Sequence, residues 1–357
     1  MNLRLIEKHQ KGSKIMSELR LFYHEDGKLK ISKNLDTLKK VDLKDLIWID
    51  LNDVPDAIET ELEQFLKIYI QEDEEIEEIE MSSRYMQTDD SIVANSNFLL
   101  DNYTLEPVSF IIKNNILVSV RNADLKSFSE TVKKIYANTK NFPSGYHVLV
   151  TLLETRVEYD ADMIEEITDQ ITGLSKTLNT EDDLDQDILI RIKDLQEKVM
   201  IIRQNIMDKQ RVVSNMLKCD FFPADLLPRL TMIIKDINSL FEYTRFGFDR
   251  LDYLQDTFLG LVNLQQNKII KIFTVVSVIF MPPTLIASMY GMNFKFMPEL
   301  SWEYGYPFSV GLMVVFSAVV LLYFRRKNGY KKTHNKNKTP IELKINRGFI
   351  FLSLDFL

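Results

Sequence analysis

The stretch IFTVVSVIFMPPTLIASMY, from Ile272 to Tyr290, contains 19 residues without a charged side chain. A second uncharged stretch, YGYPFSVGLMVVFSAVVLLYF, covers the 21 residues from Tyr304 to Phe324. A helix needs about 20 predominantly apolar residues to cross the hydrocarbon core of a bilayer. The two stretches therefore predict transmembrane helices at residues 269–290 and 304–324, and they exclude a purely soluble protein.

The positions of the basic residues predict the orientation of this hairpin. The connection at residues 291–303 carries one lysine and two glutamates. Short loops rich in Lys and Arg stay in the cytoplasm. We therefore expect a multi-pass protein of the cell (inner) membrane, with both termini cytoplasmic and the connection outside. The basic residues that flank the hairpin are Lys268, Lys271, Arg325, Arg326, Lys327, Lys331 and Lys332.

The net charge of −8 conceals a strong asymmetry. Residues 325–338 carry seven positive and no negative charges, and residues 339–357 are balanced, which leaves −15 on residues 1–324. An acidic body argues against a nucleic-acid partner and is compatible with attraction of cations. An acidic surface that is merely solvated remains the open alternative.

Residues 1–143 show the alternating strand and helix signals of an α/β domain. Strands are predicted at 19–23 and 29–32 around an Asp26-Gly27 turn, at 46–51, at 91–99, and at 108–120 folded at Asn114-Asn115. Helices are predicted from Asp53 and Pro55 through residue 68, and at 125–137. The basic, polar start has no apolar run of the kind found in a secretory signal.

Long helical patterns follow this domain. We expect two antiparallel helices within residues 144–222 and a stalk helix at 223–268 that continues into the first span without a break. From Ala224 to Tyr290 such a helix would be about 100 Å long. The predicted fold is thus an α/β cytoplasmic domain with a long α-helical stalk that continues into a two-helix transmembrane hairpin.

A stripe along the first span contains most of its small polar side chains. A stripe of this kind can face water, or it can be a packing seam, because small polar residues also join membrane helices. The residues alone leave both interpretations open. In steps of three or four the stripe comprises Asn267, Ile270, Phe273, Thr274, Ser277, Met281, Thr284 and Ser288, and it ends at Gly291 to Asn293; we call it the polar stripe.

The connection between the spans contains Tyr290-Gly291-Met292-Asn293-Phe294 and then Met297-Pro298-Glu299-Leu300. Glycine after an apolar helix is by itself an ordinary helix end. Combined with the preceding stalk and the basic end, however, the loop resembles that of the CorA family of magnesium transporters, over nearly the whole chain up to Lys332. The resemblance implies a homopentameric funnel in membrane lipid that carries Mg²⁺ inward, with Co²⁺ and Ni²⁺ as further candidate ions.

Residue by residue, the resemblance also implies a conduction path. Gly291, Met292 and Asn293 correspond to the ion entrance, and Ile270, Phe273 and Met281 to an apolar gate. Mg²⁺ loses its waters reluctantly, so neutral acceptors such as the Asn293 carbonyl suit its hydrated form. The implied pore-lining positions are Asn267, Ser277, Thr284 and Ser288, and the implied acidic position at the inner mouth is Asp256.

Regulation by cytoplasmic Mg²⁺ is a further implication of the resemblance. The family's carboxylate for this site has no clear counterpart, because the corresponding position is near Met232. A solvated acidic surface is the alternative interpretation. The candidate regulatory ligands are Asp89, Asp90, Asp236, Asp249 and Asp252.

Two other functions remain open at this stage. A transporter of zinc or another divalent metal would keep the same architecture, and a non-conducting membrane-anchored scaffold would use the hairpin only as an anchor. An enzyme is not expected, because the sequence shows no catalytic nucleophile motif, phosphate loop or Cys/His cluster. The single cysteine, Cys219, excludes an intramolecular disulfide. Residues 325–357 are expected to form a basic cytoplasmic end and a disordered tail.

Overall fold

The computed structural model describes residues 17–71, 84–180, 186–293, 295, 297–298 and 302–334. Its contacts divide the chain into two units, residues 1–259 and residues 260–357. Parts of the sequence prediction, including Phe294, Glu299, Leu300 and the tail after His334, lie outside the described residues.

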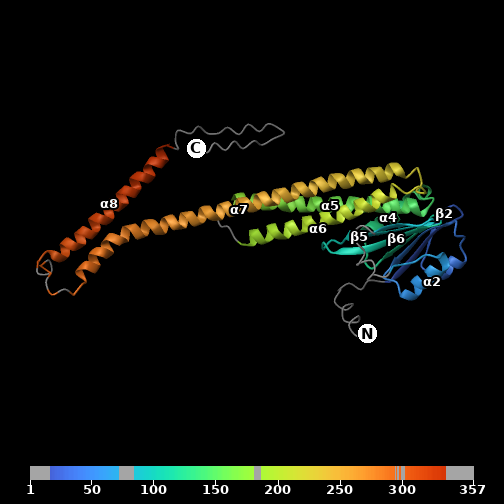
Figure 1. Cartoon of the computed structure of the whole chain (residues 1–357), viewed down its shortest axis with the longest axis horizontal. Coiled ribbons are helices and arrows are strands. Elements are labelled where there is room, and N and C mark those ends of the chain that lie inside the picture. Colours follow the sequence, from blue (N-terminus) through green and yellow to red (C-terminus); the bar gives the residue numbers. More distant parts are fainter. Residues whose placement is uncertain are drawn as a thin grey trace. The chain divides into compact units, whose positions relative to one another are not determined.

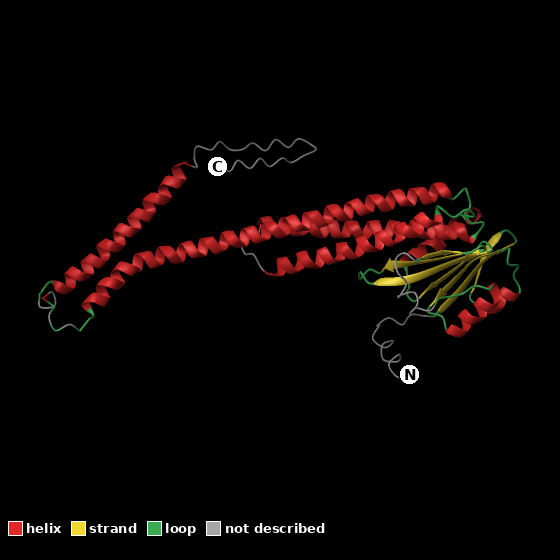
Figure 2. Ribbon diagram, in the orientation of Figure 1, coloured by secondary structure: helices red, strands yellow, loops and turns green. Residues whose placement is uncertain are grey.

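A seven-stranded mixed sheet forms the centre of the first unit (Figure 2). The strand order is β2-β1-β3-β7-β6-β5-β4, in which only β3 and β7 pair in parallel. The mixed α/β class predicted from the sequence is confirmed. The strands are β1 (Glu18–Glu25), β2 (Lys28–Ser32), β3 (Leu46–Asn52), β4 (Tyr85–Gln87), β5 (Ser91–Leu99), β6 (Leu105–Lys113) and β7 (Ile116–Arg121).

Two hairpin turns have the backbone geometry that their residues predict. Asp26 and Gly27 have φ of 53° and 71°, and Asn114 and Asn115 have φ of 51° and 65°. Positive φ at both central positions matches the twist of the flanking strands, and Gly, Asn and Asp tolerate it best. The short strand β4 was not predicted, because its three residues are at the sheet edge and carry no alternating apolar pattern.

Helices cover both faces of the sheet (Figure 1). Helix α2 (Asp56–Leu66) contributes Leu62 and Leu66 to an apolar core with Ile49 and Leu51 of β3. Successive residues of a strand point to opposite faces, so Trp48 and Asp50 face the other side. On that side Trp48 stacks on Phe22 and contacts Phe128 of α4 (Lys126–Ala137), with ring centroids 4.4 and 6.0 Å apart.

A buried carboxylate joins three strands on this second face. Asp50 is fully buried and accepts hydrogen bonds from Arg20 of β1 and from Arg121 and Ser119 of β7, at 2.6 to 3.2 Å. Burial opposes ionisation of Asp50, but the two guanidinium groups outweigh it, so the pKa lies below its ordinary value of 3.8. The Arg121 guanidinium also lies 4.4 Å from the Phe128 ring centroid, which ties β7 to α4.

The helices α5 (Gly145–Thr180) and α6 (Gln186–Met216) form an antiparallel pair beside the sheet (Figure 1). Lys209 of α6 is fully buried, 2.9 Å from Asp160 of α5, and its Nζ lies 5.7 Å from the Phe98 ring of β5. Burial lowers the pKa of Lys209 to about 8 despite this carboxylate partner. Arg156 of α5 pairs with Asp160 and donates to the Leu99 carbonyl at 2.7 Å. This charged cluster attaches the helix pair to strand β5.

Helix α7 (Leu227–Tyr290) has 64 residues and contributes to both units. In the first unit its buried residues, including Leu230, Ile233, Leu251 and Phe258, have the spacing of a helix packed along one face. In the second unit its last part runs beside α8 (Gly305–His334). The part of α8 apolar enough to span a membrane, Gly305–Phe324, matches the predicted second span, although the helix continues to His334.

Replacing Asp50 by alanine removes the shared partner of two arginines, one of which is fully buried. We expect a loss of about 3 to 5 kcal/mol in the free energy of unfolding. Urea unfolding monitored by the fluorescence of Trp48, whose indole donates to Ser119 at 2.9 Å, measures this loss. Asp101→Ala, which breaks an exposed pair with Lys126, is the control and should leave the midpoint unchanged.

The sign of the pH dependence follows from the lowered pKa of Asp50. The stabilisation is fully present above the unfolded-state pKa, about 3.9, and is lost as the pH falls through the lower folded-state pKa. Equal unfolding midpoints for the wild type and Asp50→Ala at neutral pH would contradict this role.

Candidate functional site

Helix α7 ends at the tripeptide predicted to form the ion entrance. The Gly291 amide donates to the Ala287 carbonyl at 2.9 Å, and the Met292 amide approaches the Met289 carbonyl at 3.4 Å. A Cβ atom at Gly291 would lie 3.1 Å from the Ala287 oxygen, a close contact within this last turn. Asn293 follows outside the helix with an exposed side chain. Its amide group is thus available at the end of α7.

The predicted pore-lining and gate residues are all exposed in the single chain. Ile270, Phe273 and Met281 are 61%, 67% and 67% exposed. The hydroxyl of Thr284 donates to the Phe280 carbonyl of its own helix at 2.7 Å, which leaves the oxygen lone pairs as acceptors. Asn267, Ser277 and Ser288 are exposed as well. Among the described residues of its own unit, the polar stripe therefore forms hydrogen bonds only to the backbone of its own helix.

A different face of α7 packs against α8. This face is half-buried, in contrast to the polar stripe. Ser317 of α8 donates to the Ile279 carbonyl of this face at 3.4 Å. Within one chain the helix-packing seam and the polar stripe are thus separate faces of α7. The α8-facing residues are Val275, Val278, Ile279, Pro282, Pro283 and Ile286.

Sequence reasoning missed the aromatic group at the start of α8. The Trp302 ring lies 5.6 Å from Phe308 and 6.4 Å from Tyr304, measured between centroids. Aromatic side chains concentrate at the interfaces of a bilayer. The sequence signal was present, since Trp302 and Tyr304 stand at the very edge of the second apolar stretch.

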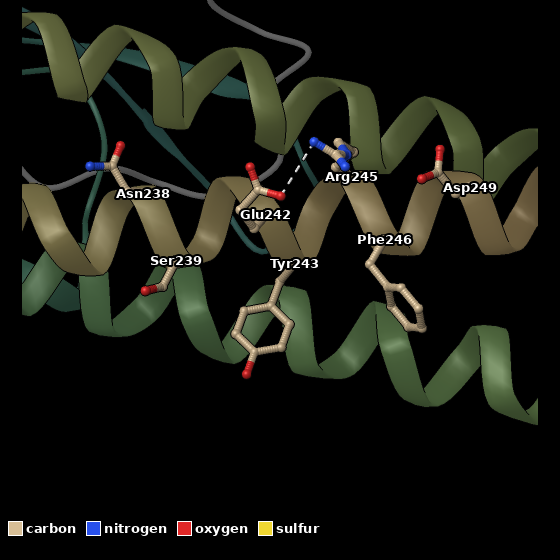
Figure 3. Close-up of a pocket in the computed structure, with 7 residues that line it drawn as sticks. All are labelled: Asn238, Ser239, Glu242, Tyr243, Arg245, Phe246 and Asp249. Atoms are coloured by element: carbon tan, nitrogen blue, oxygen red, sulfur yellow. Dashed lines mark ion pairs between the residues drawn. The ribbon is translucent and has the colours of Figure 1, made fainter. Parts of the chain in front are cut away.

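The predicted acidic positions on α7 are exposed and lie in the first unit. Asp256 lies 11 residues before Asn267. Because 11 residues make about three helical turns, the two residues lie on nearly the same face of α7. Asp252 accepts a hydrogen bond from Gln196 of α6 at 2.7 Å. Asp249 lines a surface groove of α7 together with the exposed rings of Tyr243 and Phe246, which point to the same side of the helix (Figure 3).

The remaining regulatory candidates show no preformed metal site. Asp90 pairs with Lys113 at 2.8 Å, and this hydrogen bond lowers the pKa of Asp90 below its ordinary 3.8. Asp89 and Asp236 are exposed. Across the described ranges, no group of three or more His, Cys, Asp or Glu side chains could hold a metal ion.

Comparison with known proteins identifies the family. The family model described as "CorA-like Mg2+ transporter protein" matches residues 44–326, which include strands β3 to β7 of the sheet, α7, the tripeptide and the second span. The chain belongs to this family. Membership of the CorA-like family confirms the resemblance seen in the sequence, and it makes the chain a membrane transporter with two transmembrane helices and not an enzyme.

Curated relatives within the CorA-like family cover most of the chain. A magnesium transport protein CorA from Wolinella succinogenes is 40% identical over 290 residues, which are 79% of this chain and 90% of the relative. A protein of the same name from Campylobacter jejuni is 36% identical over 312 residues, 84% of this chain and 95% of the relative.

A solved structure shows the same fold. The complete structure of a CorA magnesium transporter from Methanocaldococcus jannaschii matches with a TM-score of 0.73 at 19% identity, over 87% of this chain and 98% of that one. The α/β domain, the long helix and the second apolar helix of this chain therefore follow the CorA-like architecture.

Cysteine substitution tests which face of α7 meets water. Cys219 is the single native cysteine and is buried, so a water-soluble methanethiosulfonate reports on introduced thiols. We expect Thr284→Cys on the polar stripe to react and block transport, because thiolates form where water has access. Leu285→Cys, one residue further on a different face, should remain unlabelled in the lipid. Equal labelling of both variants would argue against a water-filled path along the polar stripe.

Proposed function

We propose that this chain forms a homopentameric channel that admits Mg²⁺ as a hydrated ion into the cytoplasm. The observation that carries the proposal is the exposed polar stripe of α7, which leads directly to Gly291, Met292 and Asn293. The names of the curated relatives, magnesium transport proteins, support Mg²⁺ as the transported ion.

The chemistry of the entrance suits a hydrated divalent cation. Mg²⁺ keeps several waters at most protein sites, and the side-chain carbonyl of Asn293 can accept hydrogen bonds from them without removing them. The hydroxyl oxygens of Thr284 and Ser277 would serve the same purpose deeper in the membrane. Met292 is 50% exposed in the single chain, so it is free to pack against a neighbouring copy.

The apolar members of the polar stripe form the proposed gate. Ile270, Phe273 and Met281 are each more than 60% exposed. A ring of such side chains from several copies would exclude water from a narrow pore, and a dewetted segment blocks a hydrated ion. Widening this ring would open the channel.

Assembly is required because a two-helix hairpin cannot enclose a pore. Copies that meet around the polar stripe bring the membrane-spanning parts of their α7 helices together. Tyr243, Phe246 and Tyr253 are each 63% exposed on the part of α7 that belongs to the first unit. The rings of Tyr243 and Phe246 point to one side of the helix, and the exposed Glu242–Arg245 ion pair, 3.5 Å long, lies on the other side (Figure 3). We assign this aromatic surface to contact with a second copy.

The membrane potential supplies the driving force for entry. Moving two charges through 100 mV is worth about 4.6 kcal/mol. The charge of −15 on residues 1–324 and the basic residues flanking the hairpin favour an acidic body inside the cytoplasm. Asp256, at the inner end of the proposed path, would attract the emerging ion.

Cytoplasmic Mg²⁺ is also the proposed regulator. Asp236, Asp249 and Asp252 on α7, and Asp89 and Asp90 just before β5, are exposed carboxylates that could bridge neighbouring copies through a cation. Loss of that cation would remove the bridge and leave like charges facing one another, which favours separation of the subunits and an open pore.

Asn293→Ala removes the proposed acceptor from every subunit. Each lost hydrogen bond is worth about 1 kcal/mol, so we expect Mg²⁺ uptake to fall by more than about tenfold while the oligomer persists. Uptake into liposomes and light scattering on a sizing column measure the two properties. Asn102→Ala, in an exposed loop of the cytoplasmic domain, is the matched control. Unchanged Mg²⁺ uptake by Asn293→Ala would contradict the assignment of Asn293 to the ion entrance.

Ion flux separates the proposed function from its alternatives. In liposomes containing the purified protein, we expect Mg²⁺ flux above Zn²⁺ flux, with Co²⁺ and Ni²⁺ also admitted, and a decrease when internal Mg²⁺ is raised. Zinc flux above magnesium flux would favour a related zinc transporter. The absence of any divalent flux would favour a non-conducting membrane-anchored scaffold.

A further inference from the structure

Two adjacent prolines interrupt the hydrogen bonding of α7 inside the first span. Pro282 and Pro283 lie within the helix, between Met281 and Thr284 of the polar stripe. Proline has no amide hydrogen, so the carbonyl four residues earlier loses its helical donor. The two carbonyls affected are those of Val278 and Ile279.

A carbonyl without a donor is unfavourable at this depth of the membrane. The hydrocarbon core offers no water, and each unsatisfied backbone group there is costly by several kcal/mol. Prolines are tolerated in membrane helices where a Ser or Thr side chain or a neighbouring helix satisfies the freed group. The carbonyls that the two prolines of α7 leave unpaired therefore need a hydrogen-bond donor from outside the α7 backbone.

Helix α8 supplies such a donor. The Ser317 hydroxyl lies 3.4 Å from the Ile279 carbonyl, the group that Pro283 leaves without its helical donor. Both residues are half-buried between the two helices. Many hydroxyls of this chain instead bond to the backbone of their own helix, as Ser309 does to Tyr306 at 2.9 Å. Ser317 thus bonds across the hairpin at the position where α7 lacks a donor.

We propose that Ser317 is a positioning residue of the permeation path, which holds the proline segment of α7 through the Ile279 carbonyl. This inference rests on the proposed channel function, because the residues so positioned, Met281 and Thr284, are on the polar stripe. The prolines and Ile279 belong to the α8-facing side, and the stripe residues point away from it. The Ser317 hydroxyl on α8 thereby fixes the position of the α7 backbone that carries the gate and pore-lining residues.

A double-mutant cycle with Pro283→Ala tests the hydrogen bond itself. Alanine at position 283 restores an amide donor to the Ile279 carbonyl, so the Ser317 hydroxyl is no longer needed. We expect Ser317→Ala to lower the thermal unfolding midpoint of the full chain in lipid nanodiscs by about 1 to 4 °C. In the Pro283→Ala background the same substitution should leave the midpoint unchanged.

Two further variants complete the test. Ser317→Thr keeps the hydroxyl and should retain the wild-type midpoint. Ser309→Ala removes a hydroxyl that bonds within α8 itself. It should therefore change the thermal unfolding midpoint equally in the wild-type background and in the Pro283→Ala background. An equal loss from Ser317→Ala in both backgrounds, or no loss in either, would overturn the proposal.

Flux measurements then separate positioning from simple stabilisation. We expect Ser317→Ala to lower Mg²⁺ flux per assembled protein about threefold, and Ser317→Thr to restore it. A thermal coupling to Pro283 with unchanged flux would show that Ser317 only stabilises the hairpin, which contradicts a positioning role. If the wild type carries no flux, the channel function fails, while the thermal cycle still decides whether the hydrogen bond exists.

Discussion

Backbone groups inside a bilayer must find their hydrogen-bond partners within the protein, and the C-terminal unit is organised by this constraint. It makes both apolar stretches helical, and α7 remains helical through its two prolines up to Tyr290. It also explains why the prolines at 282 and 283 meet a hydroxyl from α8. With one face of α7 committed to α8, the polar stripe is left exposed, so that the stripe is available to line a path formed by several copies.

A second constraint acts in the α/β domain and its helix pair, where charges are buried in compensated groups. Asp50 bonds to Arg20 and Arg121 across three strands, and the Lys209–Asp160 pair lies against Phe98. Removing one member of such a pair leaves an uncompensated charge, which is far more destabilising than the net contribution of the pair. These groups therefore fix which strands and helices pack together, although apolar burial contributes most of the stability.

Local patterns of the sequence predicted most of the elements, because those patterns reflect physical requirements that are themselves local. The turns at Asp26-Gly27 and Asn114-Asn115 follow from positive φ, and the spans follow from length and absence of charge. The edge strand β4 was missed, since three residues paired only to β5 leave no periodic signal. The end of α8 at His334 was also missed, because the charge of a basic segment is compatible with either helix or coil.

The sequence by itself determined the two spans, the helical stalk, the α/β class and the Gly291-Met292-Asn293 loop that indicates the family. It could not decide whether the small polar residues of the first span form a packing seam within the chain. The tertiary structure decided this by pairing Ile279 and the prolines with α8, which leaves Ser277, Met281 and Thr284 exposed. The physical reason is that the partner of Ile279, Ser317, lies 38 residues further along the chain, and no local pattern specifies which face of a helix meets so distant a segment.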